Sequence, residues 1–130
     1  MNEIEVTAGI IERDGRYLIA KRSTSGPVPA LWEFPGGKVE HGETRPDALR
    51  RELLEEFGLV TAIGAFVASS VFDYPHARIR LYAYRASYHS GSPDLRVHEE
   101  IRWATLEELR SLPFSPADLP LIDALAEAFP

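Results

Sequence analysis

The chain has 130 residues, of which 45% are hydrophobic and 26% charged, a balance typical of one globular domain over residues 1–130 and unlike a disordered or fibrous protein. Its 20 acidic and 14 basic residues give a formal net charge of −6, which argues against a nucleic-acid binder because such proteins usually present a basic face. The lack of cysteine excludes disulfides, thiolate metal sites and a cysteine nucleophile, and no apolar run approaches the ~20 residues that span a bilayer.

The first part of the chain predicts two strands joined by a tight turn. Met1–Glu5 is acidic and lacks the basic start of a signal peptide, so we expect a cytoplasmic protein that does not bind membranes. Residues 4–12 are rich in Ile and Val and predict a strand, Asp14-Gly15 predicts the turn, and residues 16–22 predict the returning strand. Residues 23–35 are rich in Ser, Gly and Pro and predict a loop.

One long helix is predicted in the middle of the chain, after the pair Gly36-Gly37, which favours irregular backbone. Thr44 is a good N-cap with Asp47 three residues later, and Gly58 is a natural C-terminal stop. Apolar residues at i+4 spacing form one stripe on this helix: Leu49, Leu53 and Phe57.

The C-terminal half predicts three more strands and two helices. Alternating or apolar segments indicate strands over residues 65–72, 78–88 and 101–104. A capping box opens a short helix over residues 105–111, and a final amphipathic helix is predicted over residues 121–129. Strands outnumber helices, and the long helix lies between groups of strands, which predicts an α/β fold.

The long helix carries an acidic face. Glu52, Glu55 and Glu56 are spaced i, i+3 and i+4, so their side chains emerge together, and Glu43 adds a carboxylate just before the helix. Such like charges repel, and a hard divalent cation such as Mg²⁺, which prefers oxygen ligands, would offset the repulsion. The alternative is a solvated helix face, with Arg51 forming an ordinary i, i+4 ion pair with Glu55.

The spacing of these residues forms a longer motif over residues 37–59. Gly37 is followed after five residues by Glu43, and after seven more by the segment Arg51–Leu59. This motif resembles a complete Nudix box, because every specified position is filled. The family's fold is an α/β/α sandwich around a mixed β-sheet, which the resemblance implies here.

Two further segments, Leu31–Glu40 and Ser115–Asp118, are similar to the MutT-like branch of the family. The likeness runs from Ile4 to about Leu125 and is greatest to bacterial CTP pyrophosphohydrolases and 8-oxo-dGTP diphosphatase-like proteins. It implies a hydrolase that uses Mg²⁺, with Mn²⁺ as a substitute, and that cleaves a nucleoside triphosphate to the monophosphate and pyrophosphate through attack of water at the β-phosphorus.

The resemblance leaves several choices open. Cytosine or oxidised nucleotides are the expected substrates, in a role of removing damaged nucleotides from the pool. The alternatives are a Nudix hydrolase of a nucleotide sugar or another diphosphate, and a regulatory nucleotide-binding domain without catalysis. Both monomers and homodimers fit such a family.

The resemblance also implies residue roles in the box. Glu55 and Glu56 correspond to metal ligands, together with the backbone carbonyl of Gly36. Glu52 corresponds to a further ligand or to the group that orients the attacking water. Arg51 corresponds to the arginine that orients these glutamates through charge-assisted hydrogen bonds, with a plain surface ion pair as the alternative.

A later carboxylate is expected to complete the metal site. His98-Glu99-Glu100 is the acidic cluster in the right region, and we expect Glu99 to be the ligand, with Glu100 as the alternative. His98 could act as a base, because histidine titrates near neutrality, but a solvated loop histidine is the more common case. Glu43 is expected to brace the loop.

The residues expected to form the substrate pocket come from the N-terminal part of the chain and from the segment near its C-terminus. Arg22 corresponds to a phosphate-contacting residue, Phe34 is the best candidate for stacking on the base, and Ile4 and Val6 could form the floor; core packing is the alternative for the three apolar residues. Three aromatic residues are expected on a loop near the site: Phe72, Tyr74 and His76.

Asp118 is expected to read the base. An ionised aspartate only accepts hydrogen bonds, which suits the N4 amino group of cytosine and disfavours the O6 atom of guanine. This predicts a preference for cytosine triphosphates. The alternative is a helix start in which Ser115 is the cap and Asp118 the third residue.

Overall fold

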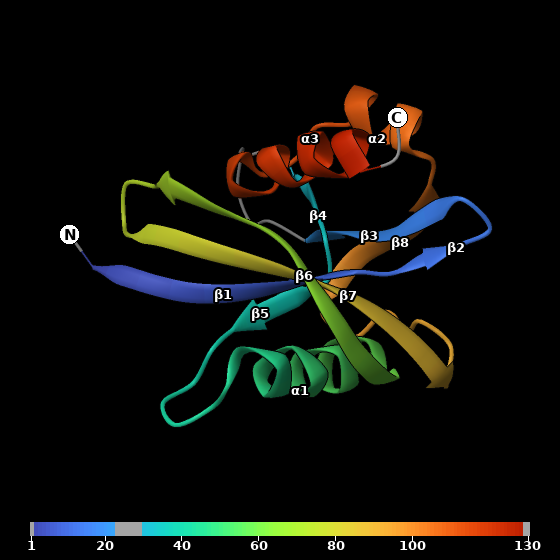
Figure 1. Ribbon diagram of the computed structural model, residues 1–130, viewed down its shortest axis with the longest axis horizontal. Helices are drawn as coiled ribbons and strands as arrows, with labels where there is room; N and C mark the ends of the chain where they lie inside the picture. The colour runs from blue at the N-terminus through green and yellow to red at the C-terminus, as the bar shows by residue number, and fades with distance from the viewer. Residues whose placement is uncertain (1, 23–29, 129–130) are drawn as a thin grey trace.

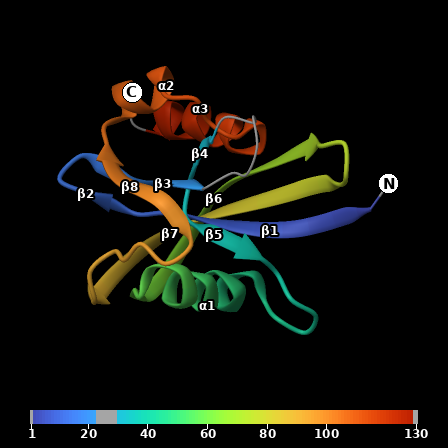
Figure 2. The same cartoon turned by 180° about the vertical axis from the view of Figure 1, so that it is seen from behind.

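A computed structural model describes residues 2–22 and 30–128 (Figures 1 and 2). Within these residues the strands form two four-stranded sheets. The first has the order β5-β1-β7-β6, where β1 is Glu3–Ile10, β5 is Gly36–Lys38, β6 is Val60–Asp73 and β7 is Arg78–Ser90. In the second, β3 (Arg16–Arg22) pairs with β2 (Glu12–Arg13), β4 (Trp32–Glu33) and β8 (His98–Ala104).

The first sheet is mixed, because β1 runs parallel to β7 and antiparallel to β5. Helix α1 (Arg45–Phe57) covers one side of the strands, while α2 (Leu106–Ser111), the 3₁₀ helix η1 (Pro116–Asp118) and α3 (Leu119–Ala128) cover the other (Figures 1 and 2). This confirms the predicted α/β/α sandwich. None of the helices in the described ranges is long and apolar enough to cross a membrane.

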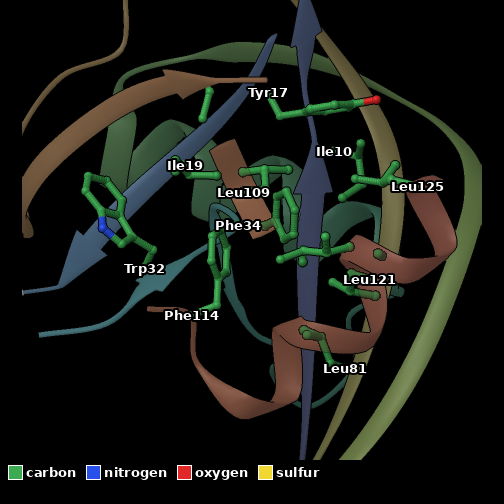
Figure 3. Close-up of a cluster of buried hydrophobic side chains, with 14 of the residues drawn as sticks. Ile10, Tyr17, Ile19, Trp32, Phe34, Leu81, Leu109, Phe114, Leu121 and Leu125 are labelled. Carbon is green, nitrogen blue, oxygen red and sulfur yellow. The ribbon is translucent and has the colours of Figure 1, made fainter. Parts of the chain in front are cut away.

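A separate apolar core lies on each side of the strands. On the α1 side, the predicted stripe Leu49, Leu53 and Phe57 is fully buried with Leu18 of β3. The opposite core joins α2 and α3 to β1, β3 and β4 (Figure 3). Burial of each large apolar side chain contributes roughly 1.5–3 kcal/mol, so both helical layers are held mainly by these contacts. The larger members of the core on the α2 and α3 side include Ile10, Ile19, Trp32, Phe34, Leu109, Phe114, Leu121 and Leu125.

The predicted ends of α1 are confirmed. The Thr44 side chain accepts a hydrogen bond from the backbone of Asp47 at 3.2 Å. Gly58 has a left-handed φ of 69°, and its N–H donates to the Leu54 carbonyl at 3.0 Å. These caps fix the length of the helix that carries the acidic face.

Three local predictions were wrong. Gly36-Gly37 is a strand, β5, because the absence of side chains lets its backbone lie directly on β1; a Cβ on Gly36 would meet the Thr7 carbonyl. Trp32–Glu33, within the predicted loop, pairs with β3 as β4; residues 23–29 of that loop lie outside the described residues. The cluster at 98–100 is also strand, because β8 begins at His98 and pairs with β3.

The two glycines of β5 predict opposite responses to alanine. Gly36→Ala should lower the free energy of unfolding by about 2 kcal/mol, because the new methyl group meets fixed β1 backbone. In Gly37→Ala the methyl group meets the Glu52 side chain, which must shift from its place against Arg51 but is not fixed backbone, so the loss should be smaller, about 1 kcal/mol. Urea denaturation of both variants measures this, and equal losses would contradict the packing described here.

Candidate active site

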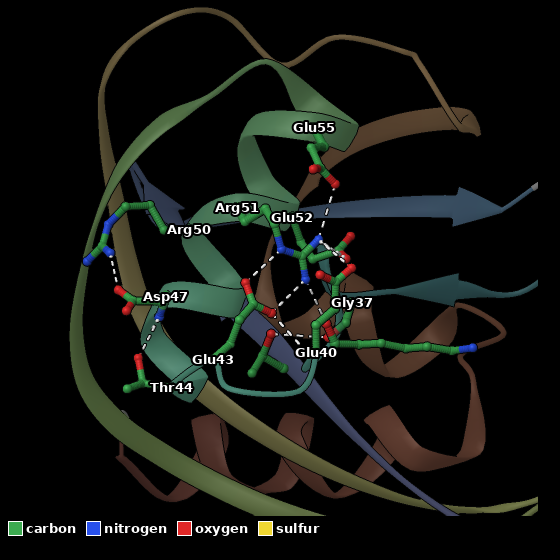
Figure 4. A network of polar contacts seen from close by, with 11 residues as sticks. Gly37, Glu40, Glu43, Thr44, Asp47, Arg50, Arg51, Glu52 and Glu55 are labelled. Carbon is green, nitrogen blue, oxygen red and sulfur yellow. Dashed lines mark hydrogen bonds and ion pairs between the residues drawn. The ribbon is translucent and has the colours of Figure 1, made fainter.

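The Arg51 guanidinium organises the acidic face of α1 (Figure 4). Its Nη1 donates to Glu52 Oε1 at 2.8 Å and to Glu55 Oε2 at 3.2 Å. Its Nε and Nη2 bind both oxygens of Glu43 at 2.8 and 2.9 Å, and Nη2 also donates to the Lys38 carbonyl at 3.0 Å. The carboxylates in turn raise the pKa of Arg51. One cation therefore offsets the repulsion among three glutamates and ties α1 to the end of β5.

Glu43 holds the loop before α1. Its bidentate contact with Arg51, together with a hydrogen bond from the Glu40 N–H, lowers the pKa of Glu43 to about 2. Glu43 is therefore ionised throughout the neutral range, which keeps the loop in place. This agrees with the expectation that Glu43 braces the loop.

Glu56 faces a different environment from Glu52 and Glu55. Burial raises the pKa of Glu56, although the Arg22 charge acts in the opposite direction. Its Oε1 lies 3.5 Å from Nη2 of Arg22, while its Oε2 is buried and has no hydrogen-bond partner. A buried carboxylate oxygen without a partner is costly, so a ligand at this oxygen would be stabilising.

The donor set fits a hard divalent cation. Glu52, Glu55 and Glu56 supply carboxylate oxygens from one helix face, and the Oε2 atom of Glu56 has no other partner. Glu52 lies directly against Gly37, so it also approaches the backbone of β5, where the Gly36 carbonyl is the expected ligand. Within residues 2–22 and 30–128, however, no three Asp, Glu or His side chains converge into a ready-made site. Glu55 is 60% exposed, and its described partner is Arg51 at 3.2 Å.

The structure places Glu99 and Glu100 at the β3–β8 ladder. The Glu99 carboxylate is 51% exposed and lies 3.6 Å from Lys21 Nζ, and Glu100 lies 3.3 Å from the same nitrogen. Glu99 thus does not join a three-carboxylate group with the acids of α1. Its role as a ligand stays a prediction.

A cavity of about 490 Å³ opens next to Arg22, the residue that contacts Glu56 of the acidic face. It adjoins a smaller cavity of about 180 Å³. Arg22 lines both, next to Glu33 and Asp118. Burial disfavours the charge of Arg22, but Glu33 and Glu56 outweigh it and raise the pKa of Arg22. Arg22 therefore places a cation at the cavity wall, and its contact with Glu56 at 3.5 Å connects the cavity to the acidic helix. The other residues that line the larger cavity are Val6, Lys38, Tyr74, His76, Ile79, Leu81, Ser115 and Ala117.

Some of the expected pocket residues lie at the cavity and others do not. Val6 is at its wall, whereas Ile4, on the same strand, is not among the described residues that line it. Phe34 touches the smaller cavity, but it is only 3% exposed and packs against Phe114 at 5.6 Å, so its main contacts are in the core. Tyr74 lines the larger cavity, and its hydroxyl contacts the Ser115 hydroxyl at 2.8 Å.

Asp118 corrects the argument about base reading. Its Oδ2 accepts a hydrogen bond from the Phe34 N–H at 2.8 Å. As the alternative expected, Ser115 precedes a short 3₁₀ helix in which Asp118 is the third residue, but the Ser115 side chain makes no capping hydrogen bond. Burial raises the pKa of Asp118 to about 8. Burial thus favours the neutral acid, which both donates and accepts. The argument for an acceptor-only carboxylate leaves out this effect, because the sequence does not report burial; the role of Asp118 in base reading stays a prediction.

Two functional candidates were missed or misjudged. Glu33 lines both cavities and contacts Arg22 at 3.2 Å. An acidic residue between Trp32 and Phe34, in an otherwise apolar segment, was a signal that could have identified it. Of the two alternatives for His98, the solvated loop histidine is wrong, because His98 begins β8, its side chain is 1% exposed and its Nε2 lies 2.9 Å from Glu33 Oε2; a role as a base stays untested.

Comparison with known proteins agrees with this geometry. A NUDIX domain model matches residues 6–124. The chain is 41% identical over 124 residues to the CTP pyrophosphohydrolase of Escherichia coli K12, covering 95% of this chain and 92% of that protein. It is 36% identical over 123 residues to the 8-oxo-dGTP diphosphatase of Haemophilus influenzae, covering 94% and 90%.

The fold is also similar to a solved structure at the same level of identity. The solution structure of the E. coli ORF135 protein matches with a TM-score of 0.88 and 41% identity, covering 98% of this chain and 91% of that one. A family match over most of the chain, relatives above 30% identity and the Arg51-centred acidic helix agree with one another. The chain belongs to the Nudix hydrolase family.

Proposed function

We propose that this protein is a Mg²⁺-dependent nucleoside triphosphate pyrophosphohydrolase that releases a nucleoside monophosphate and pyrophosphate. The observation that carries the proposal is the acidic face organised by Arg51, placed beside a cavity that Arg22 lines. Nudix hydrolases generally need a divalent metal, and carboxylate oxygens suit Mg²⁺, with Mn²⁺ as a substitute. A cytoplasmic role in clearing the nucleotide pool fits this activity.

The residues divide the work by position. Glu52, Glu55, Glu56 and the Gly36 carbonyl would hold the metal, which supplies positive charge to the phosphate oxygens when bound. Arg51 keeps Glu52 and Glu55 in a fixed arrangement, so these carboxylates need little reorganisation. Phosphoryl transfer depends mainly on such positioning and charge neutralisation.

Arg22 would bind the substrate phosphates directly, in addition to the metal held by the acids of α1. It lies between Glu33 and Glu56 at 3.2 and 3.5 Å, so a phosphate would compete with these carboxylates for the guanidinium. The Glu99 carboxylate would have to leave Lys21 to act as an additional ligand. The apolar walls, Val6, Ile79 and Leu81, would hold the base at the deeper end of the cavity.

Base preference is proposed to follow the proton on Asp118. The ionised carboxylate would accept from the N4 amino group of cytosine, and the neutral acid would donate to a carbonyl such as O6 of 8-oxoguanine. Triphosphates of cytosine and of oxidised guanine are therefore the proposed substrates, in line with the names of the two relatives described above. A nucleotide-sugar hydrolase or a non-catalytic domain would show neither activity.

The first prediction concerns the metal-binding acids. Glu55→Gln and Glu56→Gln should each lower kcat for pyrophosphate release by about 100-fold or more, because each loses a ligand charge. Glu127→Gln, at an exposed position of α3, is the matched control and should be unaffected. The assay measures pyrophosphate and phosphate separately across a Mg²⁺ titration. Near-normal activity in both variants would refute the assignment.

The second prediction concerns base choice and pH. The ratio of kcat/KM for dCTP to that for 8-oxo-dGTP should rise about tenfold as pH passes upward through 8, because Asp118 changes from donor to acceptor. Asp118→Asn should show no such rise, because it removes Asp118 but keeps the other ionisable residues at the cavity, Arg22, Glu33, Lys38 and His76. An equal slope in both proteins would assign the effect to the substrates or to those groups.

The third prediction concerns stability. The pKa of Asp118 is about 8 when folded and ~3.9 in an unfolded chain, so the folded protein binds more protons between these values. The free energy of unfolding should therefore fall as pH rises from 4 to 8, relative to Asp118→Asn, and the difference should be constant above 8. The asparagine keeps an oxygen for the Phe34 N–H. Urea denaturation at pH 5, 7 and 9 gives the comparison; parallel curves would contradict a buried titrating acid.

A further inference from the structure

His98 is buried beside the cavity in a position that the proposed chemistry does not use. Its side chain is 1% exposed, and its ring stacks on Phe57 of α1 with 4.9 Å between the centroids. Its Nε2 lies 2.9 Å from Oε2 of Glu33, while Nδ1 is buried without a hydrogen-bond partner. A carboxylate oxygen accepts, so this geometry places a proton on Nε2.

Glu33 connects this histidine to Arg22. The same Oε2 atom accepts from His98 Nε2 and, at 3.2 Å, from Nη2 of Arg22. Side-chain exposure rises along the row, from 1% for His98 to 25% for Glu33 and 44% for Arg22. The row therefore leads from the core of the protein to the cavity.

A β-bulge gives His98 its inward direction. The β3–β8 ladder pairs Lys21 with Glu100 and then shifts, so that Arg22 pairs with His98 and Glu99 is the extra residue. In an unbroken strand Glu99 would share the face of Ile101, which packs in the core under α1. The shift turns His98 onto that face instead and leaves the Glu99 carboxylate 51% exposed.

We propose that His98 is a positioning residue that fixes the Glu33 carboxylate and, through it, sets how firmly Arg22 is held at the cavity. The proposal rests on the role of Arg22 as the phosphate-binding cation. While His98 occupies one oxygen of Glu33, that oxygen is shared between two donors, and the Arg22 contact is correspondingly loose at 3.2 Å. Arg22 is then available to exchange Glu33 for a phosphate.

Loss of the His98 donor should affect binding more than chemistry. Without it, the Glu33 carboxylate is free to turn and form a tighter, two-point pair with Arg22, a geometry that strongly favours arginine and carboxylate. The substrate must then break this pair, so KM rises. The acids of α1 are held separately by Arg51, so kcat should change little.

The experiment compares two substitutions at one position. His98→Leu fills the space against Phe57 but removes the donor, and it should raise KM for dCTP about tenfold while kcat stays within about threefold. His98→Gln, whose amide can donate to Glu33, should restore KM to within about threefold of wild type. His89→Leu, the same change at an exposed histidine, is the matched control. Thermal denaturation verifies that each variant is folded.

A second background tests whether His98 acts through Glu33. In Glu33→Gln the carboxylate is absent, so adding His98→Leu should have no further effect on KM. The proposal is overturned if His98→Leu has a wild-type KM, if His98→Gln is as impaired as His98→Leu, or if the KM rise persists in the Glu33→Gln background. Equal losses of kcat and stability in both His98 variants would assign the residue a structural role only.

An NMR measurement separates this inference from the proposed function. In ¹⁵N-labelled protein, the His98 ring should carry its proton on Nε2, and its ring signals should shift in Glu33→Gln. A proton on Nδ1 alone would overturn the inference even in an active enzyme. Absence of Mg²⁺-dependent pyrophosphate release from wild type would refute the function, while the Nε2–Glu33 contact would still be present in the spectrum.

Discussion

The site depends on one cation placed among several anions. Arg51 contacts Glu43, Glu52 and Glu55 and also reaches the Lys38 carbonyl at the end of β5. Without it, the acidic face would be a set of repelling charges on an exposed helix, free to adopt many rotamers. With it, the loop before α1, the helix and the glycine strand form one rigid unit. The caps at Thr44 and Gly58 then fix where that unit lies on the sheet.

The two sides of the sandwich have different tasks. The α1 side carries the carboxylates that would hold the metal under the proposed function, and the α3 side supplies η1, whose Asp118 lines the cavity. The segment from Glu33 to Lys38 passes between them and contacts both, through the Asp118–Phe34 hydrogen bond and the approach of Glu52 to Gly37. Residues far apart in sequence therefore meet at one short stretch of backbone.

The elements that the sequence predicted well are those with local causes. The ends of α1, its apolar stripe and its acidic face follow from capping and i, i+4 spacing, and the Asp14-Gly15 turn follows from turn preferences. The errors have long-range causes. The β-bulge that buries His98 depends on pairing with β3, and the raised pKa of Asp118 depends on the elements packed around η1. The strand at Gly36-Gly37 forms because β1 fills the space that side chains would take.

The hydrogen bond from Phe34 to Asp118 has a consequence for dimensions. Phe34 and Gly36 are two residues apart across a bend at Pro35, so covalent bonds keep their Cα atoms within about 7 Å of each other. Pro35 contributes as well, since its carbonyl is fixed by the Gly9 N–H at 2.7 Å. The candidate base-reading group, Asp118, and the candidate metal-binding carbonyl of Gly36 are thus attached to the two ends of a three-residue backbone segment, whose covalent length side-chain mutations cannot change. Under the proposed function, substitutions can change what each end recognises, while this short covalent connection limits the distance between the two recognition points.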